Sequence, residues 1–368
     1  MKKISTGKNI FLKISFISFL LYSLFLYSEE TELRPYKLIN ADKLILTKVH
    51  EGYITNLIGN VHFFYGETEF FSDEADIFEE EKIARLRGNV KVYDDTLNLY
   101  ADKVDYFRMT EKLVLDENVL VNEAHKDSTI RTFKAEHVDY FRIERELYAL
   151  ENVRMYDERE DLNGSCGQLN YYLIDGYGYL MKSPALSLAG EDSIQVSAEK
   201  MEYFKDFEKV VATFNVITQS NEFDLTSDFL LYFAQEDKAI YLGDPKFSSE
   251  SADASAIELQ LFFEDKKMKK AVLKDSCSVY FKTDEESSDI SWVTANSMYF
   301  DFKDGKVKLF DAQDNVDSYY HQDETDKKEM AINKATGKHL IISINNENEI
   351  ETIDMRKQVQ GLYKFHKK

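Results

Sequence analysis

Side chains that could carry catalysis or hold a metal are scattered along this 368-residue sequence. The histidines show none of the short spacings of a zinc site, and no cysteine pair lies near them. The seven are His50, His62, His125, His137, His321, His339 and His366. Gly164-Ser165-Cys166-Gly167 superficially resembles a nucleophile turn, but it lacks a glycine two residues before the serine and a strand-to-helix setting. Because a glycine-rich phosphate loop is also missing, we expect no enzyme activity, no metal and no cofactor.

Acidic residues dominate the charge of the chain. Asp and Glu number 67 against 46 Lys and Arg, which gives a formal net charge of −21. Some of so many carboxylates must be neighbours by chance, so their presence does not indicate a glycosidase pair. A nucleic acid is not an expected partner, because a polyanion needs a basic surface. The hydrophobic content of 43% and aromatic content of 14% exclude wholesale disorder.

The first 28 residues differ in composition from the rest of the chain. Lys2, Lys3, Lys8 and Lys13 precede an uncharged apolar run over 14–27, and Ser28 is a small residue at a plausible cleavage point. This pattern predicts a cleaved export signal over residues 1–28. The run is shorter than the roughly 20 residues of a transmembrane helix, and a retained anchor is the alternative. We expect residues 29–37 to be a linker and residues 38–365 to form one repeat domain.

The two cysteines, Cys166 and Cys277, lie far apart in the sequence. A disulfide framework normally shows several closely spaced cysteines. Two buried free thiols are therefore the simpler interpretation, and a bridge between them is the alternative.

A short phrase, in its clearest form Gly or Glu followed by Asn-Val, recurs along the mature chain. Fixed-period self-similarity is the signature of a repeat architecture. The nine middle positions are Asn60, Asn89, Asn118, Asn152, Pro184, Asn215, Pro245, Ser276 and Asn315. Successive positions are 29 to 39 residues apart, so we expect about nine repeats of about 30 residues.

A second phrase alternates with the first. It consists of Ala, a polar pair, an apolar residue, an acid and two aromatic residues, as in 101–107, 135–141 and 198–204. Looser copies begin at Ala41, Ala75, Ser227, Ala256 and Ala295. Each repeat therefore contains two phrases.

Both phrases have the period of a β-strand. Around the first phrase, Leu113, Leu115, Val119 and Val121 share one parity, which indicates one apolar face. In the second, the apolar parity switches between residues 102 and 103, as at a β-bulge or strand corner. Helical periodicity with start and stop signals is absent.

These patterns predict an all-β fold, an elongated open antiparallel β-jelly roll or "taco". A 30-residue unit cannot bury its apolar face alone, so the units must stack into two facing walls. Splayed walls would leave a continuous apolar trough that suits acyl chains, whereas closed walls would form a dry core. The predicted inward residues are Leu115, Val119, Val121, Val153, Met155, Phe214, Val216, Leu273 and Val279.

An open stack also leaves unpaired strands at its two ends. Segments 38–49 and 340–363 alternate apolar residues without a proline to protect them. We expect β-augmentation there, with sister copies or with related domains of other proteins. The predicted edge residues are Leu44, Leu46, Leu340 and Ile342.

The alternation of Ala-Asp-Lys-Val-Asp-Tyr with Leu-Asp-Glu-Asn-Val-Leu-Val resembles the LptA/OstA family of lipopolysaccharide-transport proteins. The resemblance follows a predicted export signal and extends over residues 38–365, ending in 350–353 and 360–363. It implies a periplasmic bridge in outer-membrane biogenesis, which holds acyl chains between two walls. It also implies strand pairing with an inner-membrane lipid-extraction complex and an outer-membrane translocon. The chain is longer than the simplest family pattern, and no barrel-sized segment follows residue 368.

Two other functions remain alternatives to a lipid-transport bridge. One is a structural or adhesive envelope repeat protein with a dry core. The other is a polysaccharide-active β-solenoid enzyme, which would be a parallel β-helix with one-strand rungs. The residues do not identify which lipid a trough would carry or how many copies would assemble.

Overall fold

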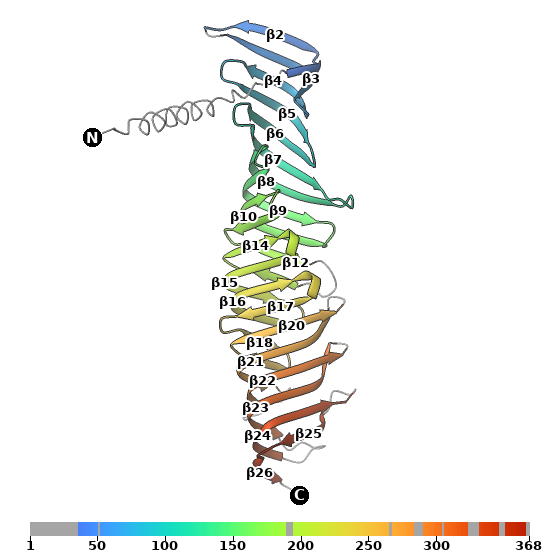
Figure 1. Cartoon of the computed structure of the whole chain (residues 1–368), viewed down its shortest axis with the longest axis vertical. Helices are drawn as coiled ribbons and strands as arrows, with labels where there is room; N and C mark the ends of the chain where they lie inside the picture. Colours follow the sequence, from blue (N-terminus) through green and yellow to red (C-terminus); the bar gives the residue numbers. More distant parts are fainter. Residues whose placement is uncertain are drawn as a thin grey trace, which may run out of the picture.

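The computed structural model describes residues 36–50, 52–188, 194–264, 267–282, 290–303, 305–322, 331–345 and 350–365. These residues form one long stack of β-strands, which the chain builds from one end to the other (Figure 1). The predicted export signal, 1–28, and most of the predicted linker, 29–37, lie outside the described residues. Within the described ranges, no helix has the length and apolar character needed to span a membrane.

Strands make up most of the described chain, and its only helical elements are two short 3-10 turns, η1 (Lys205–Phe207) and η2 (Ala234–Glu236). The first thirteen strands are β1 (Tyr36–Asn40), β2 (Lys43–Lys48), β3 (Tyr53–Tyr65), β4 (Thr68–Phe78), β5 (Ile83–Asp94), β6 (Leu97–Phe107), β7 (Lys112–Ala124), β8 (Ile130–Phe141), β9 (Glu146–Asp157), β10 (Leu162–Tyr172), β11 (Tyr177–Met181), β12 (Ala185–Leu188) and β13 (Ile194–Ser197). The others are β14 (Lys200–Phe204), β15 (Lys209–Gln219), β16 (Phe223–Phe233), β17 (Lys238–Leu242), β18 (Lys246–Ser249), β19 (Ala252–Ser255), β20 (Glu258–Glu264), β21 (Lys267–Phe281), β22 (Ser291–Lys303), β23 (Lys306–Gln322), β24 (Ala331–Ile344), β25 (Ile350–Arg356) and β26 (Gln360–Phe365).

Paired strands run antiparallel throughout the described residues. The predicted all-β antiparallel fold is therefore confirmed. The same pairing is incompatible with a parallel β-helix in these residues, so the solenoid-enzyme alternative loses the fold that it requires.

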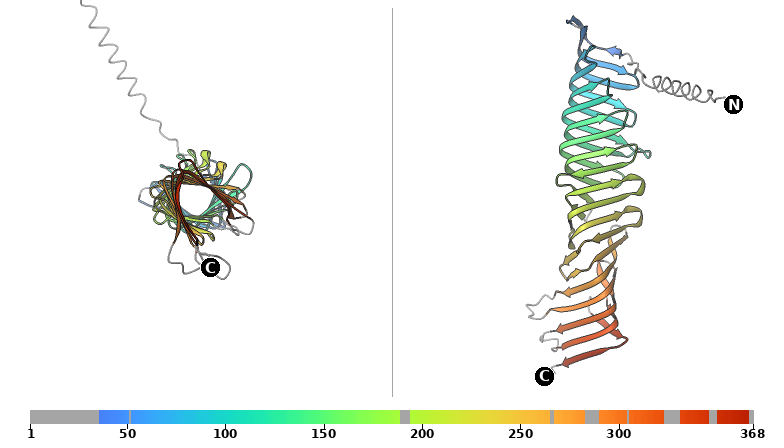
Figure 2. Two further views of the ribbon diagram at one scale, coloured as in Figure 1. Left: turned by 90° about the horizontal axis from the view of Figure 1, so that it is seen from below. Right: turned by 60° about the vertical axis from the view of Figure 1, so that its left-hand side comes forward.

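Each long strand bends in its middle, and its two halves belong to two facing walls. In β7, residues 112–116 pair with the second half of β6, whereas 120–123 pair with its first half. Wall A also contains the short strands β2, β11, β14, β17, β20 and β25. Wall B contains β1, β12, β13, β18, β19 and β26. The end view in Figure 2 shows the walls enclosing a central interior.

We call the side on which the strands bend the corner, and the opposite side, where the hairpin ends of the two walls meet, the seam. In β3, β5, β7, β9, β15, β21 and β23 two consecutive residues with positive φ make the bend, and in β7 they are Glu117 (66°) and Asn118 (53°). Asparagine tolerates this left-handed conformation better than most residues. Its side-chain amide also donates a hydrogen bond of 2.6 Å to the Asp102 carboxylate of the neighbouring strand. Equivalent bonds join Asn60 to Asp42, Asn89 to Asp73 and Asn215 to Glu199.

The corner explains why the two phrases alternate. The first phrase supplies the left-handed bend, and in four repeats an acid in the polar pair of the second phrase, or just before that phrase, accepts the asparagine amide. Where glycine precedes the asparagine, it is required by space as well as by its positive φ. A Cβ on Gly88 would lie 2.5 Å from an Asp73 carboxylate oxygen.

Replacing Asn118 with alanine is expected to lower the free energy of unfolding by roughly 1–2 kcal/mol, because alanine loses the amide hydrogen bond and disfavours the left-handed conformation. Urea unfolding followed by circular dichroism measures this change. Asn163 is the matched control, since it is exposed in β10 and its φ is not positive. Equal losses for Asn118→Ala and Asn163→Ala would contradict the role given to the corner.

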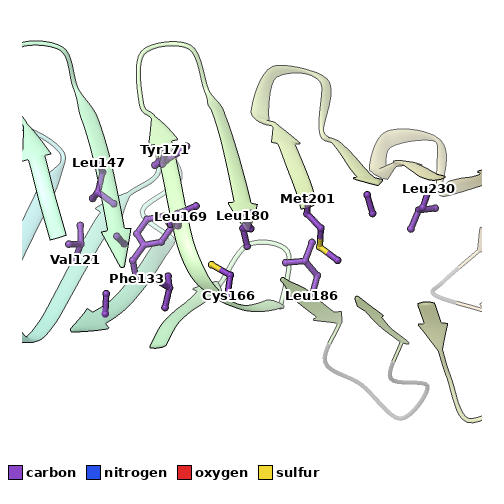
Figure 3. Packing of buried hydrophobic residues seen from close by; sticks show 14 of the residues in the cluster. Val121, Phe133, Leu147, Cys166, Leu169, Tyr171, Leu180, Leu186, Met201 and Leu230 are labelled. Carbon is purple, nitrogen blue, oxygen red and sulfur yellow. The ribbon is translucent and has the colours of Figure 1, made fainter. Parts of the chain in front are cut away.

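The inward side chains of both walls form one elongated hydrophobic core. Figure 3 shows part of it, with Val121 and Phe133 from wall B and Leu147 and Leu169 from wall A in the same interior. Because each wall alternates inward and outward residues, the period of two in the sequence becomes one buried row per half-strand.

Candidate functional site

Most of the residues predicted to face the interior do so. Leu115, Val119, Val121, Val153, Val216, Leu273 and Val279 are buried, and Met155 is partly buried against the core. They come from both walls and from strands between β7 and β21. They are therefore spread along the interior and do not form one local pocket.

Phe214 is the exception, and its predicted inward position is wrong. It is the first of two consecutive residues with positive φ at the bend of β15, where it matches Glu117 of β7. At the bend the side chains of Phe214 and Asn215 both point away from the interior, and Phe214 is 56% exposed. Its ring lies beside that of Phe229 on the outer surface, with centroids 5.8 Å apart.

At the amino end the predicted edge residues lie on a terminal strand, whereas at the carboxyl end they lie on a strand with neighbours on both sides. Leu44 and Leu46 lie on β2, which pairs with β3 alone among the strands that the structure describes, and they are 53% and 57% exposed. Leu340 and Ile342 lie on β24, whose carboxyl half pairs with both β23 and β25, and Leu340 is buried. The predicted edge segment 340–363 includes β25 and most of β26, which are the last strands of the described chain, but the two residues singled out within it lie one strand farther in.

Both ends of the stack expose apolar side chains next to the core. Leu44 pairs with Leu57, which is buried, and Leu38 pairs with Phe63, which is also buried. At the other end, Ile353 pairs with Ile342 and is itself exposed. We call these two apolar ends the mouths of the interior.

A cavity lies between the walls near the middle of the stack, where β10 is followed by the short strands β11 to β14. Most of its lining is apolar. The apolar side chains are Phe133, Met155, Leu162, Leu169, Leu180, Leu186, Met201 and Val210. Polar residues of the lining include Arg131, Asp157, Tyr171 and Tyr203.

The inward guanidinium of Arg131 joins these polar residues. Its Nε and Nη2 atoms donate to Asp157 Oδ2 at 2.8 and 2.6 Å, and its Nη1 donates to the Tyr171 hydroxyl at 3.0 Å. The side chains of Arg131 and Asp157 are each 3% exposed. Glu123 lies 3.4 Å from Arg131 and accepts from Lys205 Nζ at 3.3 Å. A buried charge is tolerated only when it is paired in this way.

This group crosses from one wall to the other at the seam. Glu123, Arg131 and Asp157 come from the hairpin ends of wall B, whereas Tyr171, Tyr203 and Lys205 come from those of wall A. We call these six residues the seam cluster. Farther out, Arg159 of wall B lies 3.9 Å from Glu208 of wall A, and both side chains are about one-third exposed.

Gly178 makes room for the guanidinium within the cluster. It pairs with Tyr171 on one neighbouring strand and with Tyr203 on the other. Arg131 lies over both rings, 5.7 Å from the Tyr171 centroid and 5.2 Å from that of Tyr203. A Cβ on Gly178 would come within 3.1 Å of the Tyr171 ring.

Charges in the seam cluster hold one another in their ionised forms. Burial alone would raise the pKa of Asp157, but the Arg131 guanidinium, His125 and a backbone donor together lower it. Burial raises the pKa of Tyr171 and of Tyr203. Both hydroxyls therefore stay protonated near neutral pH.

A second polar group closes the seam nearer the amino end. Asp94 of wall B lies 3.5 Å from both Arg142 and Arg145 of wall A, and it accepts from the Tyr140 hydroxyl at 2.9 Å. Arg142 also pairs with Glu111 at 2.6 Å. Ion pairs therefore join the walls at two levels between residues 94 and 208.

The prediction of inward residues missed most of the cavity and all of its charged rim. Arg131 shares the inward parity of Phe133 and Ala135, and Asp157 shares that of Val153 and Met155. A charge at the inward parity of an amphipathic strand is the signal that could have marked the seam. Which charges meet depends on pairing between distant hairpins, and one strand does not reveal it.

Neither cysteine is placed for nucleophilic chemistry. Both are buried free thiols, and burial raises the pKa of Cys166 to about 11 and that of Cys277 to about 12. A thiol with so high a pKa holds almost no thiolate near neutral pH. No cluster of three or more metal-ligating side chains occurs among the residues that the structure describes.

Comparison with known proteins links part of the chain to one family. Residues 36–172 match the family model described as OstA-like protein. Among solved structures, the chain is similar to LptH of Pseudomonas aeruginosa, described as the LptA-homologous periplasmic component of the conserved lipopolysaccharide transport device. That likeness has 14% identity and a TM-score of 0.27, and covers 28% of this chain and 75% of LptH. No curated protein matches the chain.

The family match extends from β1 to the end of β10. It includes Glu123, Arg131, Asp157 and Tyr171 of the seam cluster. Residues 36–172 are therefore similar to OstA-like proteins, which confirms the resemblance over this part of the chain.

Proposed function

We propose that this protein carries amphipathic lipids, with their acyl chains between the two walls and their polar heads in water. Lipopolysaccharide or a related glycolipid is the proposed cargo, and the periplasm is the proposed location. The proposal includes no catalytic step, because transport needs only a surface that holds the acyl chains. Energy for movement would come from a partner.

The mid-stack cavity is the observation that carries this proposal. Its apolar lining comes from both walls, and the hydrophobic core continues from it in both directions along the stack. Each methylene moved from water into such surroundings contributes about 0.8 kcal/mol. A few chains of a dozen carbons would therefore bind well if the walls part to admit them.

The two mouths support a bridge made of more than one domain. Within the described residues, each wall ends at both ends of the stack in a strand that is paired on one side only, β2 and β25 in wall A and β1 and β26 in wall B. A second domain placed end to end could continue both walls and cover the apolar residues of the mouths. The proposed partners are sister copies, an inner-membrane extraction complex and an outer-membrane translocon.

Photo-crosslinking at two phenylalanines tests where lipid lies. Benzoylphenylalanine in place of Phe133, which lines the cavity, is expected to capture lipopolysaccharide or a diacyl phospholipid supplied to the purified full chain. The same substitution at Phe214, on the outer corner, is expected to capture neither. Mass spectrometry of the crosslinked protein identifies the captured lipid.

A structural envelope protein with a dry core is the second candidate. The amino-terminal third favours it, because Phe63 and Phe70 are fully buried and stack with centroids 5.0 Å apart. If both folded variants fail to capture lipid, the dry-core function replaces the transport function. Equal capture at Phe133 and Phe214 would also contradict binding between the walls.

A further inference from the structure

We propose that the seam cluster is the latch of a side opening, through which a lipid with its head in water passes the middle of the stack. This inference rests on the proposed function. It adds the place where the walls must part and the residues that hold them closed.

The position of the lipid head creates the need for an opening. A lipid with its acyl chains between the walls keeps its polar head outside, because an unpaired polar head inside would lose several kcal/mol of hydration. The head must therefore project through the seam. Ion pairs and hydrogen bonds join the walls across the seam at Glu123–Lys205, Arg131–Tyr171 and Arg131–Tyr203. A lipid cannot move past this level while these contacts persist.

Charges suit a seam that opens and closes. An apolar seam would expose hydrophobic surface to water each time it parted, and the free-energy cost of that exposure would keep the seam shut. Carboxylates, guanidinium and ammonium groups regain water when they separate, and hydration offsets part of the lost attraction. A buried ion pair stabilises a fold little more than apolar residues of similar volume would, so stability alone does not explain this cluster.

The cations of the seam are all paired with carboxylates. Arg131 and Lys205 face Glu123 and Asp157, and farther out Arg159 lies 2.8 Å from Glu160 and 3.9 Å from Glu208. Each sign is supplied partly from one wall and partly from the other. The closed seam therefore has no excess of positive charge for a bound anion, which distinguishes a latch from a site for an anionic head group.

The carboxyl-terminal half is held differently. Among the described residues from 209 onward, no ion pair joins the two walls. A contact there is made by Phe281 of wall B and Phe310 of wall A, whose ring centroids lie 6.2 Å apart. Among the described residues, ionic contacts across the seam therefore lie between residues 94 and 208, and the seam cluster is the one of the two levels that adjoins the cavity.

A reversible covalent bridge across the seam tests the latch. Arg159→Cys and Glu208→Cys, at partly exposed positions on opposite walls, are joined by a flexible bis-thiosulfonate linker that a reducing agent cleaves. The native thiols compete poorly because they are buried and have raised pKa values. The same full-length variant carries benzoylphenylalanine in place of Phe133, and crosslinking at this position reports that a lipid has reached the cavity.

Two pyrene-labelled probes give the readout. Pyrenedodecanoic acid has a small head that can travel protonated from a mouth, so its capture at Phe133 is expected to persist when the seam is bridged. A vesicle-borne phosphatidylethanolamine with one pyrenyl chain has a head group that stays charged. Its capture at Phe133 in the bridged protein is therefore expected to fall to the level of unirradiated protein. Cleaving the linker is expected to restore it. The Arg159→Cys variant with the linker attached at one end is the control.

The outcomes separate the two proposals. Undiminished capture of the phospholipid in the bridged protein overturns the latch and leaves the proposed function standing. Failure of both probes in the unbridged protein overturns the proposed function and, with it, the latch. Selective loss of the phospholipid, reversed by reduction, supports both.

Discussion

Replacing Arg131 with alanine is expected to lower the free energy of unfolding at neutral pH by about 3–5 kcal/mol, because it leaves buried carboxylates without their cation. Asp157 would lose its direct partner, and Glu123 would keep only Lys205. Tyr171 and Tyr203 would also lose the guanidinium that lies over their rings. Urea unfolding monitored by circular dichroism measures the loss.

The effect is expected to depend on pH. Because the pKa of Asp157 is lowered in the folded protein, its contribution is fully present above its ordinary pKa of about 3.9. That contribution is lost as pH falls through the lowered folded value. The difference between Arg131→Ala and the parent is therefore expected to shrink below about pH 4.

Two further variants distinguish a broken ion pair from a general loss of packing. Arg154 is exposed on the outer face of wall B, and Arg154→Ala is expected to change stability by less than about 0.5 kcal/mol. Combining Arg131→Met with Asp157→Leu removes both charges and is expected to recover most of the stability. A combined variant as unstable as Arg131→Ala would contradict the electrostatic explanation.

The fold was predictable because each strand carries a local pattern. Strand period, antiparallel pairing and the change of face between residues 102 and 103 are all found in the structure. Alignment was less certain at degenerate repeats. Pro184 stands where the sequence alignment expects an asparagine, but the two residues with positive φ are Lys182 and Ser183. Proline follows the bend there, because its ring fixes φ at a negative value.

The seam was not predictable in the same way. The tyrosine of the second phrase recurs as Tyr106, Tyr140 and Tyr203, and a half-buried aromatic residue is ordinary in a strand. Its significance depends on the opposite wall. The Tyr140 hydroxyl donates to Asp94, which lies in a hairpin 46 residues earlier in the chain. The Tyr203 hydroxyl accepts from Arg131, which lies 72 residues earlier. Contacts of this separation follow from how the repeats stack, which no single repeat encodes.

Placing lysine at both Leu44 and Leu46 is expected to abolish end-to-end association. Both residues lie on the terminal strand β2, where Leu44 pairs with the buried Leu57, so they lie on the side of β2 that continues the core into the mouth. Charged side chains turned inward on an edge strand are a common protection against pairing. Sedimentation of the purified full chain over a range of concentrations measures association, with a concentration-dependent mass expected for the parent and not for this variant.

Ile45→Lys is the matched control for that experiment, because Ile45 lies on the same strand with the opposite parity. A charge on the outer face leaves the backbone edge and the mouth unchanged, so Ile45→Lys is expected to associate like the parent. At the other end, Ile353→Lys on β25 is expected to act like the Leu44 and Leu46 variant, because it alters the complementary mouth. In a mixture of the two mouth variants, one variant keeps its carboxyl-end mouth and the other keeps its amino-end mouth. The mixture is therefore expected to form pairs, and no assembly of more than two chains. Longer assemblies in that mixture would mean that the mouths are not the joining surfaces, and the bridge would lose its main physical support.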